Sequence, residues 1–307
     1  MNNKIGIAVI LALGTAIISG VSNVIAKVGV SAANDPVVFT FLKNAAVGLL
    51  LVGAIVLFRK MKELMHLSRR QWALLIAIGI VGGSIPFAMF FTGLTMTSAL
   101  SASLIHKTLF IWVALLAVPM LRERIGALQA SALLLLVFGN FALGGINSFR
   151  WGTGELLILG ATLFWAAENI IAKKVLLQVS SMTVAAARMV IGSIILLGYI
   201  LVRGDGHMLI GLTGVQWIWT LISAVLLFGY VTTWYSALKR APATLVASLL
   251  VPASLITNIL SQLFLDNTMT HAQVTSAAAM LLGVFLLLWE VRRNHSHVPS
   301  NAVGADN

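Results

Sequence analysis

The sequence predicts an all-α membrane protein with ten transmembrane helices arranged as two inverted five-helix repeats. Of its 307 residues, 59% are hydrophobic and only 9% are charged, and the mean hydropathy is +0.99, values typical of a chain surrounded mostly by lipid. The apolar segments are long and lack the alternation of a membrane β-barrel. The second half of the chain also repeats features of the first. The composition excludes a soluble enzyme, and the absence of cysteine excludes disulfides and thiolate metal sites.

The first predicted span covers Ile5–Ala26, a stretch of 22 uncharged residues. At 1.5 Å per residue, such a helix crosses a hydrocarbon core of about 30 Å. It lacks a small-residue cleavage site, so we expect a membrane span and not a signal peptide. Breaks at Gly, Pro and charged clusters predict nine more spans, over residues 36–58, 71–93, 97–120, 126–146, 151–174, 181–202, 214–238, 243–265 and 271–290.

Basic residues orient these spans. With a cytoplasmic N-terminus, 14 of the 20 Lys and Arg residues lie in cytoplasmic segments, four lie within spans, and two (Arg150 and Arg203) lie outside. Because cytoplasmic loops carry the excess of Lys and Arg, we expect a multi-pass protein of the cytoplasmic (inner) membrane with both termini in the cytoplasm. This distribution excludes nucleic acid as a partner. The loop from Arg59 to Arg70 either anchors the topology or binds anionic lipid. The polar segment 293–307 is predicted to be a disordered cytoplasmic tail.

An internal repeat relates the two halves. The segment Asn23–Lys27 recurs as Asn169–Lys173 at an offset of 146 residues, and polar matches of this kind are uncommon in membrane spans. The repeats therefore cover residues 1–146 and 150–292. Because five spans is an odd number, the second repeat enters the membrane from the opposite face, an arrangement that underlies alternating access. Further matches pair Gly14 with Gly160 and, at an offset of 144, Leu94 with Leu238, Ala99 with Ala243, Leu121 with Leu265, and Gln129 with Gln273.

With these features the chain resembles the EamA branch of the drug/metabolite transporter superfamily. The resemblance also rests on the basic residue early in the second helix of each repeat, Lys43 and Arg188, and on the Leu121–Arg124 segment that closes the fourth helix. Two positions depart from the family pattern: Lys43 stands where the family usually has Arg, and the counterpart of Glu123 is Asn267. The resemblance implies a ten-helix transporter, often an exporter of metabolites or amino acids, with a central cavity among spans 1, 3, 4, 6, 8 and 9.

Ionised side chains inside the membrane cost about 2.5 to 3.5 kcal/mol on insertion scales, so each one predicts a role. Lys107 is the deepest, and its spacing places it on one helix face with Ser103 and His106. This face either lines a watered cavity or forms a packed internal ion pair or another polar contact that locks the helix bundle.

Glu168 is the only acidic residue well inside a span, and it shares a helix face with Trp165 and Asn169. Three interpretations stay open. The carboxylate forms a structural salt bridge with Lys107 or Arg188, it binds protons or substrate, or it reaches the membrane interface.

A polar stripe of Thr15, Ser19, Asn23 and Lys27 follows the first span. Either hydrogen bonds between helices or a solute path explains it. Lys43 and Arg188 lie one to two turns inside their helices, where they either have a structural role or bind an anion.

Aromatic and proline residues mark further spans. Tyr230 and Trp234 share a face of the eighth span, where aromatic rings either pack or line a pocket for small amphipathic solutes. The third span likewise contains Phe87, Phe90 and Phe91, whose rings either pack or line such a pocket. Pro86 and Pro252 lie within spans, where a missing N–H kinks the helix and exposes a carbonyl, a feature that suits gating.

The sequence contains no zinc-protease motif, phosphate-binding loop or large extramembrane domain. We therefore expect a secondary transporter and not an enzyme, with no cofactor and no metal. The expected partners are the lipid bilayer and a small organic solute, and a homodimer stays open. Charges of both signs beside aromatic rings favour a zwitterion such as an amino acid, whereas export is implied only by the resemblance. An intramembrane enzyme using His106 or Glu168 and a passive channel are the alternatives.

The predicted substrate-binding residues are Asn23, Ser103, His106, Lys107, Trp165, Glu168, Asn169, Tyr230 and Trp234, and the predicted coupling or gating residues are Glu168, Lys43, Arg188, Pro86 and Pro252.

Overall fold

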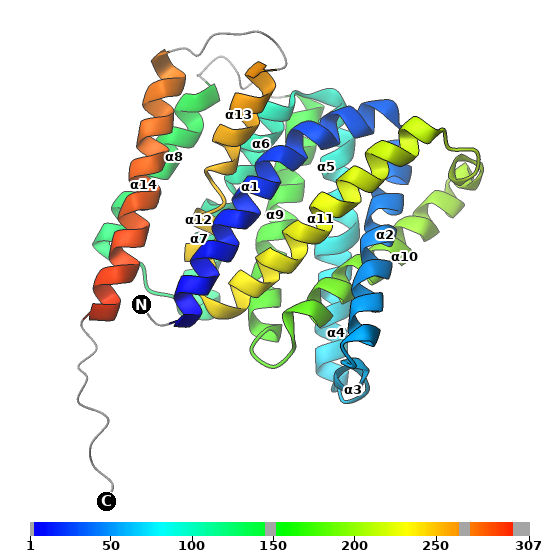
Figure 1. Cartoon of the computed structure of the whole chain (residues 1–307), viewed down its shortest axis with the longest axis horizontal. Helices are drawn as coiled ribbons and strands as arrows, with labels where there is room; N and C mark the ends of the chain where they lie inside the picture. The colour runs from blue at the N-terminus through cyan, green and yellow to red at the C-terminus, as the bar shows by residue number, and fades with distance from the viewer. Residues whose placement is uncertain (1–2, 145–151, 264–270, 297–307) are drawn as a thin grey trace, which may run out of the picture.

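The computed structural model describes residues 3–144, 152–263 and 271–296, which form helices joined by short connections (Figure 1). The helices of the first half are α1 (Asn3–Ala32), α2 (Pro36–Leu57), α3 (Met61–Met65), α4 (Arg69–Ile78), the π-helical η1 (Gly79–Ser84), α5 (Ile85–Met96), α6 (Ala99–Lys107), α7 (Leu109–Leu121) and α8 (Ala127–Gly144). Those of the second half are α9 (Thr153–Val175), α10 (Ser181–Val202), the 3₁₀ helix η3 (Asp205–Leu209), α11 (Gly214–Arg240), α12 (Ala243–Ser248), α13 (Ala253–Leu263) and α14 (His271–Ser296).

The predicted all-α fold is confirmed. Among the described residues, nine helices are long and apolar enough to cross a membrane, and α8 adds a shorter apolar helix. Three spans are interrupted: the third by η1, the fourth at Thr108, and the ninth by a turn over residues 249–252. The kinks expected from Pro86 and Pro252 fall in the third and ninth spans, whereas the break at Thr108 was not anticipated.

Two helices continue further than predicted. The first was expected to end at Ala26 but continues to Ala32, because the ammonium of Lys27 is hydrogen-bonded to backbone carbonyls within the protein, as described below. Residues 293–296, expected to belong to a disordered tail, continue α14 to Ser296, where the basic residues near its end suit the negative pole of the helix dipole. The rest of the tail, 297–307, and the segments 145–151 and 264–270, with Arg150 and Asn267, lie outside the described residues.

Side-chain caps explain where many helices begin. Ser68 and Thr213 each form a capping box, with Gln71 and Gln216 respectively. Each box satisfies two N–H groups that a helix start leaves free.

Glu63 of the short helix α3 joins the first half of the chain to the second. Its carboxylate accepts hydrogen bonds from the Ser180 backbone N–H (2.6 Å) and the Thr183 hydroxyl (3.0 Å), at the start of α10. Partial burial raises the pKa of Glu63, but the hydrogen bonds from Ser180 and Thr183 lower it more, so the pKa lies below its usual value. Ionised Glu63 therefore holds α3 against α10.

Contacts between the two halves are arranged in equivalent pairs. The first span, α1, packs along α11 of the eighth span, and the sixth span, α9, packs along α5 of the third (Figure 1). The α2–α10 and α8–α14 contacts each join spans in the same position of the two halves. Repeats related by a two-fold axis produce this pattern.

The first helices of the two halves run in opposite directions. Lys27 lies near the end of α1, and its ammonium donates a hydrogen bond to the carbonyl of Thr97 (2.7 Å). The Thr97 hydroxyl in turn donates to Glu155, near the start of α9 (2.5 Å). The end of the first span and the start of the sixth therefore lie on the same side of the protein, as in inverted repeats.

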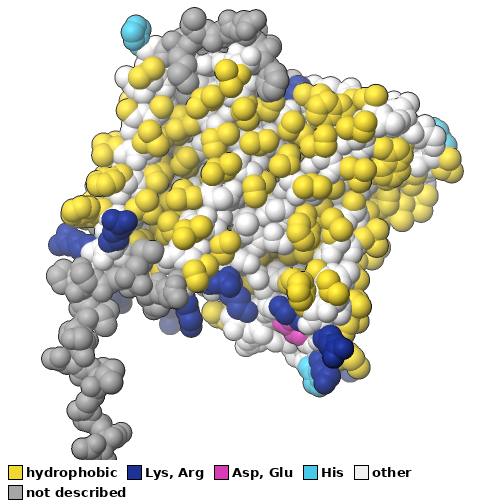
Figure 2. Space-filling model, in the orientation of Figure 1, with side chains coloured by type: hydrophobic (Ala, Val, Ile, Leu, Met, Phe, Trp, Pro, Cys, Tyr) yellow, Lys and Arg dark blue, Asp and Glu magenta, His cyan; other side chains and the backbone are white. Residues whose placement is uncertain are grey.

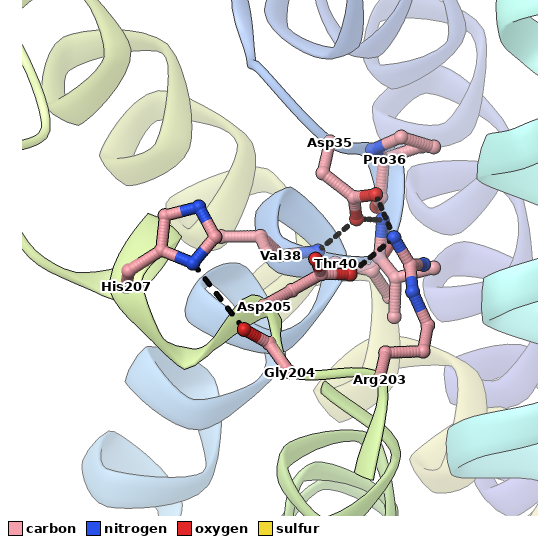
Figure 3. A network of polar contacts seen from close by, with 9 residues as sticks. Asp35, Pro36, Val38, Thr40, Arg203, Gly204, Asp205 and His207 are labelled. Atoms are coloured by element: carbon pink, nitrogen blue, oxygen red, sulfur yellow. Dashed lines mark hydrogen bonds and ion pairs between the residues drawn. The ribbon is translucent and has the colours of Figure 1, made fainter. Parts of the chain in front are cut away.

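The surface has the polarity of a membrane protein. Hydrophobic side chains cover most of the face shown in Figure 2, and Lys and Arg gather along the edge where α1 begins and α14 ends. At the opposite edge, Arg203 donates to Asp35 (2.9 Å) and pairs with Asp205 (2.5 Å), while Asp35 also caps α2 through the N–H groups of Val37 and Val38 (Figure 3). The charge of Arg203 is thus neutralised locally.

Candidate functional site

A cavity of about 80 Å³ lies between the two repeats. Of the predicted substrate-binding residues, Ser103 and Lys107 are absent from its lining, and the other seven are present. Span 9, which the family resemblance placed around the cavity, contributes no lining residue, whereas spans 2 and 7 contribute Lys43 and Arg188. The complete lining is Ser19, Ser22, Asn23, Ala26, Lys43, Phe87, Phe90, Phe91, His106, Leu109, Trp165, Glu168, Asn169, Arg188, Ser223, Leu227, Tyr230 and Trp234.

Glu168 is fully buried in the cavity wall, with 0% of the residue exposed, so the interpretation that it reaches the interface is wrong. The hydroxyl of Tyr235 donates to Glu168 Oε1 (2.5 Å), and Arg188 donates to the same hydroxyl (3.2 Å). Neither Arg188 nor Lys107 forms an ion pair with Glu168 within 4.0 Å. The direct salt bridge is therefore replaced by a tyrosine that links the two charges.

The second carboxylate oxygen, Glu168 Oε2, is buried and has no hydrogen-bond partner. The Ser223 hydroxyl, which also lines the cavity, is likewise without a partner. Buried polar atoms are normally satisfied, so these two atoms are available to a proton or to a bound solute.

Arg188 is held by a carbonyl that the third span exposes. Pro86 has no N–H with which to bond the carbonyl four residues earlier, that of Gly82, and the chain there forms the π-helical segment η1. The freed Gly82 oxygen accepts hydrogen bonds from Arg188 Nε (3.0 Å) and Trp165 Nε1 (3.0 Å). Only glycine fits at position 82, because a Cβ there would lie 2.4 Å from Glu168 Cγ.

Lys43 contributes a second buried cation. Its ammonium lies 4.0 Å from the ring centre of Phe91 and 4.5 Å from that of Phe87, distances at which an aromatic face attracts a cation. It also donates a hydrogen bond to the side-chain oxygen of Asn44 (3.2 Å). Aromatic faces thus stabilise Lys43, and no carboxylate of the described residues lies within 4.0 Å of it.

Lys107 and Ser103 lie behind the cavity wall. The Lys107 ammonium donates to the Ser19 hydroxyl (2.7 Å), and Asn23 donates to Ser103 (3.0 Å) and more weakly to Thr257 (3.3 Å). Lys107 forms no ion pair among the described residues, and its bond to Ser19 fits the interpretation of a polar contact that locks the bundle. Only the third member of the face, His106, lines the cavity, where its ring packs against Trp165 (4.9 Å between ring centres).

The opposite wall combines rings with an amide. Trp234 Nε1 donates to Asn169 Oδ1 (2.9 Å), and Tyr230 stacks on Trp234 with ring centres 5.9 Å apart. The Phe87 ring meets Trp165 edge to face at 5.3 Å. Hydrogen bonds and ring contacts therefore fix these side chains before any solute binds.

The polar stripe of α1 connects this helix to its neighbours. Thr15 bonds Thr233 of the eighth span (2.7 Å), while Ser19 and Asn23 bond the fourth and ninth as described. Lys27 donates to the carbonyl of Leu94 (2.6 Å) as well as to that of Thr97. Both interpretations of the stripe thus have support, since Ser19 and Asn23 also line the cavity.

The repeat-related lysine makes the equivalent contacts. Lys173 donates to the carbonyls of Leu238 (2.6 Å) and Ala241 (2.6 Å), and Leu238 is the sequence match of Leu94. In each half, a lysine at the end of the first span thus binds the free carbonyls where the third span ends.

Pro252 lies at the break between α12 and α13. Because it cannot donate to the Ser248 carbonyl, that oxygen accepts from Val251 instead (3.2 Å), and the chain forms a turn. The fourth span is interrupted at Thr108, which is 144 residues earlier and so occupies the repeat-equivalent position. Neither Pro86 nor Pro252 lines the cavity, and their gating role stays a prediction.

Sequence reasoning missed Gly82, Ser223 and Tyr235. The role of Gly82 could have been predicted, because a proline four residues later leaves the carbonyl of this residue without its helical hydrogen bond. Tyr235 follows Trp234 directly, but its contact with Glu168 depends on how α11 packs against α9, which one sequence does not specify.

Known proteins with similar sequences are named as transporters. The chain is 24% identical over 242 residues to an uncharacterized transporter of Methanothermobacter thermautotrophicus, covering 75% of this chain and 68% of the relative. It is 25% identical over 240 residues to an uncharacterized transporter of Synechocystis sp., covering 74% and 68%.

One solved crystal structure shares the fold, with a TM-score of 0.75 and 16% sequence identity over 94% of this chain and 98% of the other. The sequence model of the EamA-like transporter family matches twice, at residues 6–144 and 152–289. The chain therefore belongs to the EamA-like transporter family of the drug/metabolite transporter superfamily and contains two copies of its repeat.

Proposed function

We propose that this transporter exports a small zwitterionic metabolite of the amino-acid type by alternating access. The observation that carries the proposal is the unpartnered oxygen Glu168 Oε2 in a cavity that also contains the cations Lys43 and Arg188. A solute with one ammonium and one carboxylate group matches both signs of charge.

The ammonium of the solute would donate to Glu168. A buried carboxylate oxygen without a donor costs free energy, and Tyr235 satisfies only Oε1. In the empty transporter a proton takes the free position, so solute and proton compete for one oxygen. This competition would couple solute export to proton entry.

The carboxylate of the solute would bind near Lys43 and Arg188. Both cations lie against the ring of Phe87, with the Lys43 ammonium 4.5 Å and the Arg188 guanidinium carbon 5.3 Å from its ring centre. Two like charges around one ring favour an anion near them. The surrounding rings of Phe90, Trp165 and Trp234 would hold an apolar side chain.

Two inverted copies of the repeat support alternating access, because each side of such a protein has an equivalent closed arrangement. The edge rich in Lys and Arg supports a cytoplasmic position for both termini. Export is proposed from family resemblance alone.

Counterflow in proteoliposomes tests the proposal. Vesicles loaded with an unlabelled amino acid should accelerate uptake of the labelled one, and a pH gradient should drive accumulation. Glu168→Gln should abolish the pH-driven component, because the amide releases no proton. Exchange should remain with weaker solute binding, because the amide oxygen still accepts a hydrogen bond from the ammonium but carries no charge. A matched control, Glu155→Gln at the membrane edge, should retain both.

The other candidate functions give different results. A channel would dissipate every gradient without counterflow, and an enzyme would convert the solute to a product. Undiminished pH-driven uptake by Glu168→Gln would remove Glu168 from the coupling mechanism.

A further inference from the structure

A second concave surface lies on the outside of the protein, between α7 and α8. It has a volume of about 480 Å³, and its lining contains only apolar residues, among them Phe110, Leu115, Leu133 and Leu134. Both helices belong to apolar segments of the membrane region, so the groove opens toward hydrocarbon. A flexible acyl chain is the ligand that this lining and this location favour.

Two arginines stand at one end of the groove. Arg122 and Arg124 lie in the segment that joins α7 to α8, between Pro119 and Ile125, both of which line the groove. Both arginines are exposed, and no hydrogen bond or ion pair of either guanidinium group is found among the described residues. Two guanidinium groups at the membrane edge are thus available to an anion.

Neighbouring carboxylates do not neutralise these arginines. Glu123, between them in the sequence, turns inward and accepts hydrogen bonds from the backbone of Ala243 (2.6 Å) and Thr244 (3.0 Å) at the start of α12. Glu290 of α14 lies beside Gly126 and faces the charge of Arg293. The turn at Arg122, whose φ is 56°, separates the inward Glu123 from the end of α7.

We propose that this groove is a binding site for one anionic phospholipid, with an acyl chain between α7 and α8 and the phosphate held by Arg122 and Arg124. The site lies outside the central cavity and does not depend on which solute is transported. The two arginines distinguish it from the lipid that covers any apolar helix, because a zwitterionic phospholipid brings no net negative charge to them.

Native mass spectrometry of the purified chain, titrated with phosphatidylglycerol or with phosphatidylcholine of the same acyl chains, tests the proposal. The wild type should hold one phosphatidylglycerol molecule in preference to phosphatidylcholine. The double variant Arg122→Gln/Arg124→Gln should lose most of this preference, about fivefold for each guanidinium removed. The matched control Arg69→Gln/Arg70→Gln removes two exposed arginines from the start of α4 and should retain it.

A second variant tests the contribution of the acyl chain to binding separately from that of the headgroup. Leu134 lines the groove and is 69% exposed, so Leu134→Trp should fill the groove without disturbing the core. It should reduce retention of both lipids, whereas Leu49→Trp, at a position 75% exposed on α2, should not. An undiminished preference in the Arg122/Arg124 variant, or an equal loss in the Arg69/Arg70 control, would overturn the site and leave only general attraction to anionic lipid.

Discussion

Lys43 and Lys107 are both almost fully buried, yet their ammonium groups have different surroundings. Lys43 lines the cavity over two aromatic rings, while Lys107 lies behind α1 and bonds the Ser19 hydroxyl. Depth in the membrane indicated Lys107 as the anion-binding residue, but depth says nothing about the direction of a side chain. Of the two lysines, Lys43 lines the cavity and Lys107 does not.

Lys43→Met should weaken binding of carboxylated solutes selectively, by about 10- to 100-fold, the range of a charge-assisted hydrogen bond. Lys107→Met, the matched control, should lower thermal stability and should affect neutral and carboxylated solutes alike. Solute-dependent shifts in melting temperature measure both effects. Equal losses for neutral solutes in the Lys43 variant would assign it a structural role.

The packing of some helices requires glycine where two backbones come close together. A Cβ added to Gly83 would lie 2.0 Å from the Arg188 carbonyl oxygen, and Gly192 lies directly opposite. This approach brings the third and seventh spans together, and with them the guanidinium of Arg188 and the carbonyl of Gly82.

Gly83→Ala should therefore separate these helices and destabilise the protein by about 1–3 kcal/mol, as in other overpacked cores. Gly53→Ala on α2 is the control, since a Cβ there meets nothing within 4 Å and helix propensity favours alanine. Thermal melting in detergent compares the two. Equal melting temperatures would mean that the spans can move apart at no cost.

The contact of Glu63 between α3 and α10 predicts that the stability of the protein depends on pH. Its pKa is lowered from 4.5 in the folded protein, so its stabilising effect is present at neutral pH and is lost as the pH falls through the folded pKa. Glu63→Gln should lower the melting temperature at pH 7. The loss in free energy of unfolding should be less than about 1 kcal/mol, because the contact is partly exposed to solvent. The variant and the wild type should converge in acid, and a constant difference at all pH values would contradict the assignment.

The predictability of the elements follows from the same physics. Apolar length alone predicts the spans, because every backbone N–H in lipid needs a partner within its helix. The break at Thr108 could not be predicted from its own sequence, because no Gly or Pro lies there. It could be predicted only from Pro252, the equivalent residue of the second repeat. The pairing of Glu168 with Tyr235 and of Lys107 with Ser19 depends on contacts between spans, for which a single sequence gives no register.

At the scale of the whole molecule, the starts of the fourth and ninth spans differ in burial. Ala243, Thr244 and Leu245 are buried at the start of the ninth span, where Glu123 caps the helix. The repeat-equivalent residues 99–101, at the start of the fourth span, are only half-buried. Glu123 thus holds the fourth and ninth spans together on the side where α1 begins.

Glu123→Ala should open this side. Because the chain contains no cysteine, a single Ser22→Cys in the cavity wall reports access without background. A membrane-impermeant thiol reagent added from the side of the termini should label it several-fold faster in the Glu123→Ala background. Glu63→Gln, on the same edge but between other spans, should leave labelling unchanged, and an unchanged rate in both would show that Glu123 does not close the cavity.

The carbonyl of Gly82 has a mechanical consequence for such movements. One oxygen atom of the third span holds the indole of the sixth and the guanidinium of the seventh. If α5 swings about the π-helical turn, both groups either travel with that oxygen or are released together. Solute release would then be a concerted step, in which the aromatic wall and the cation leave the bound molecule at the same moment.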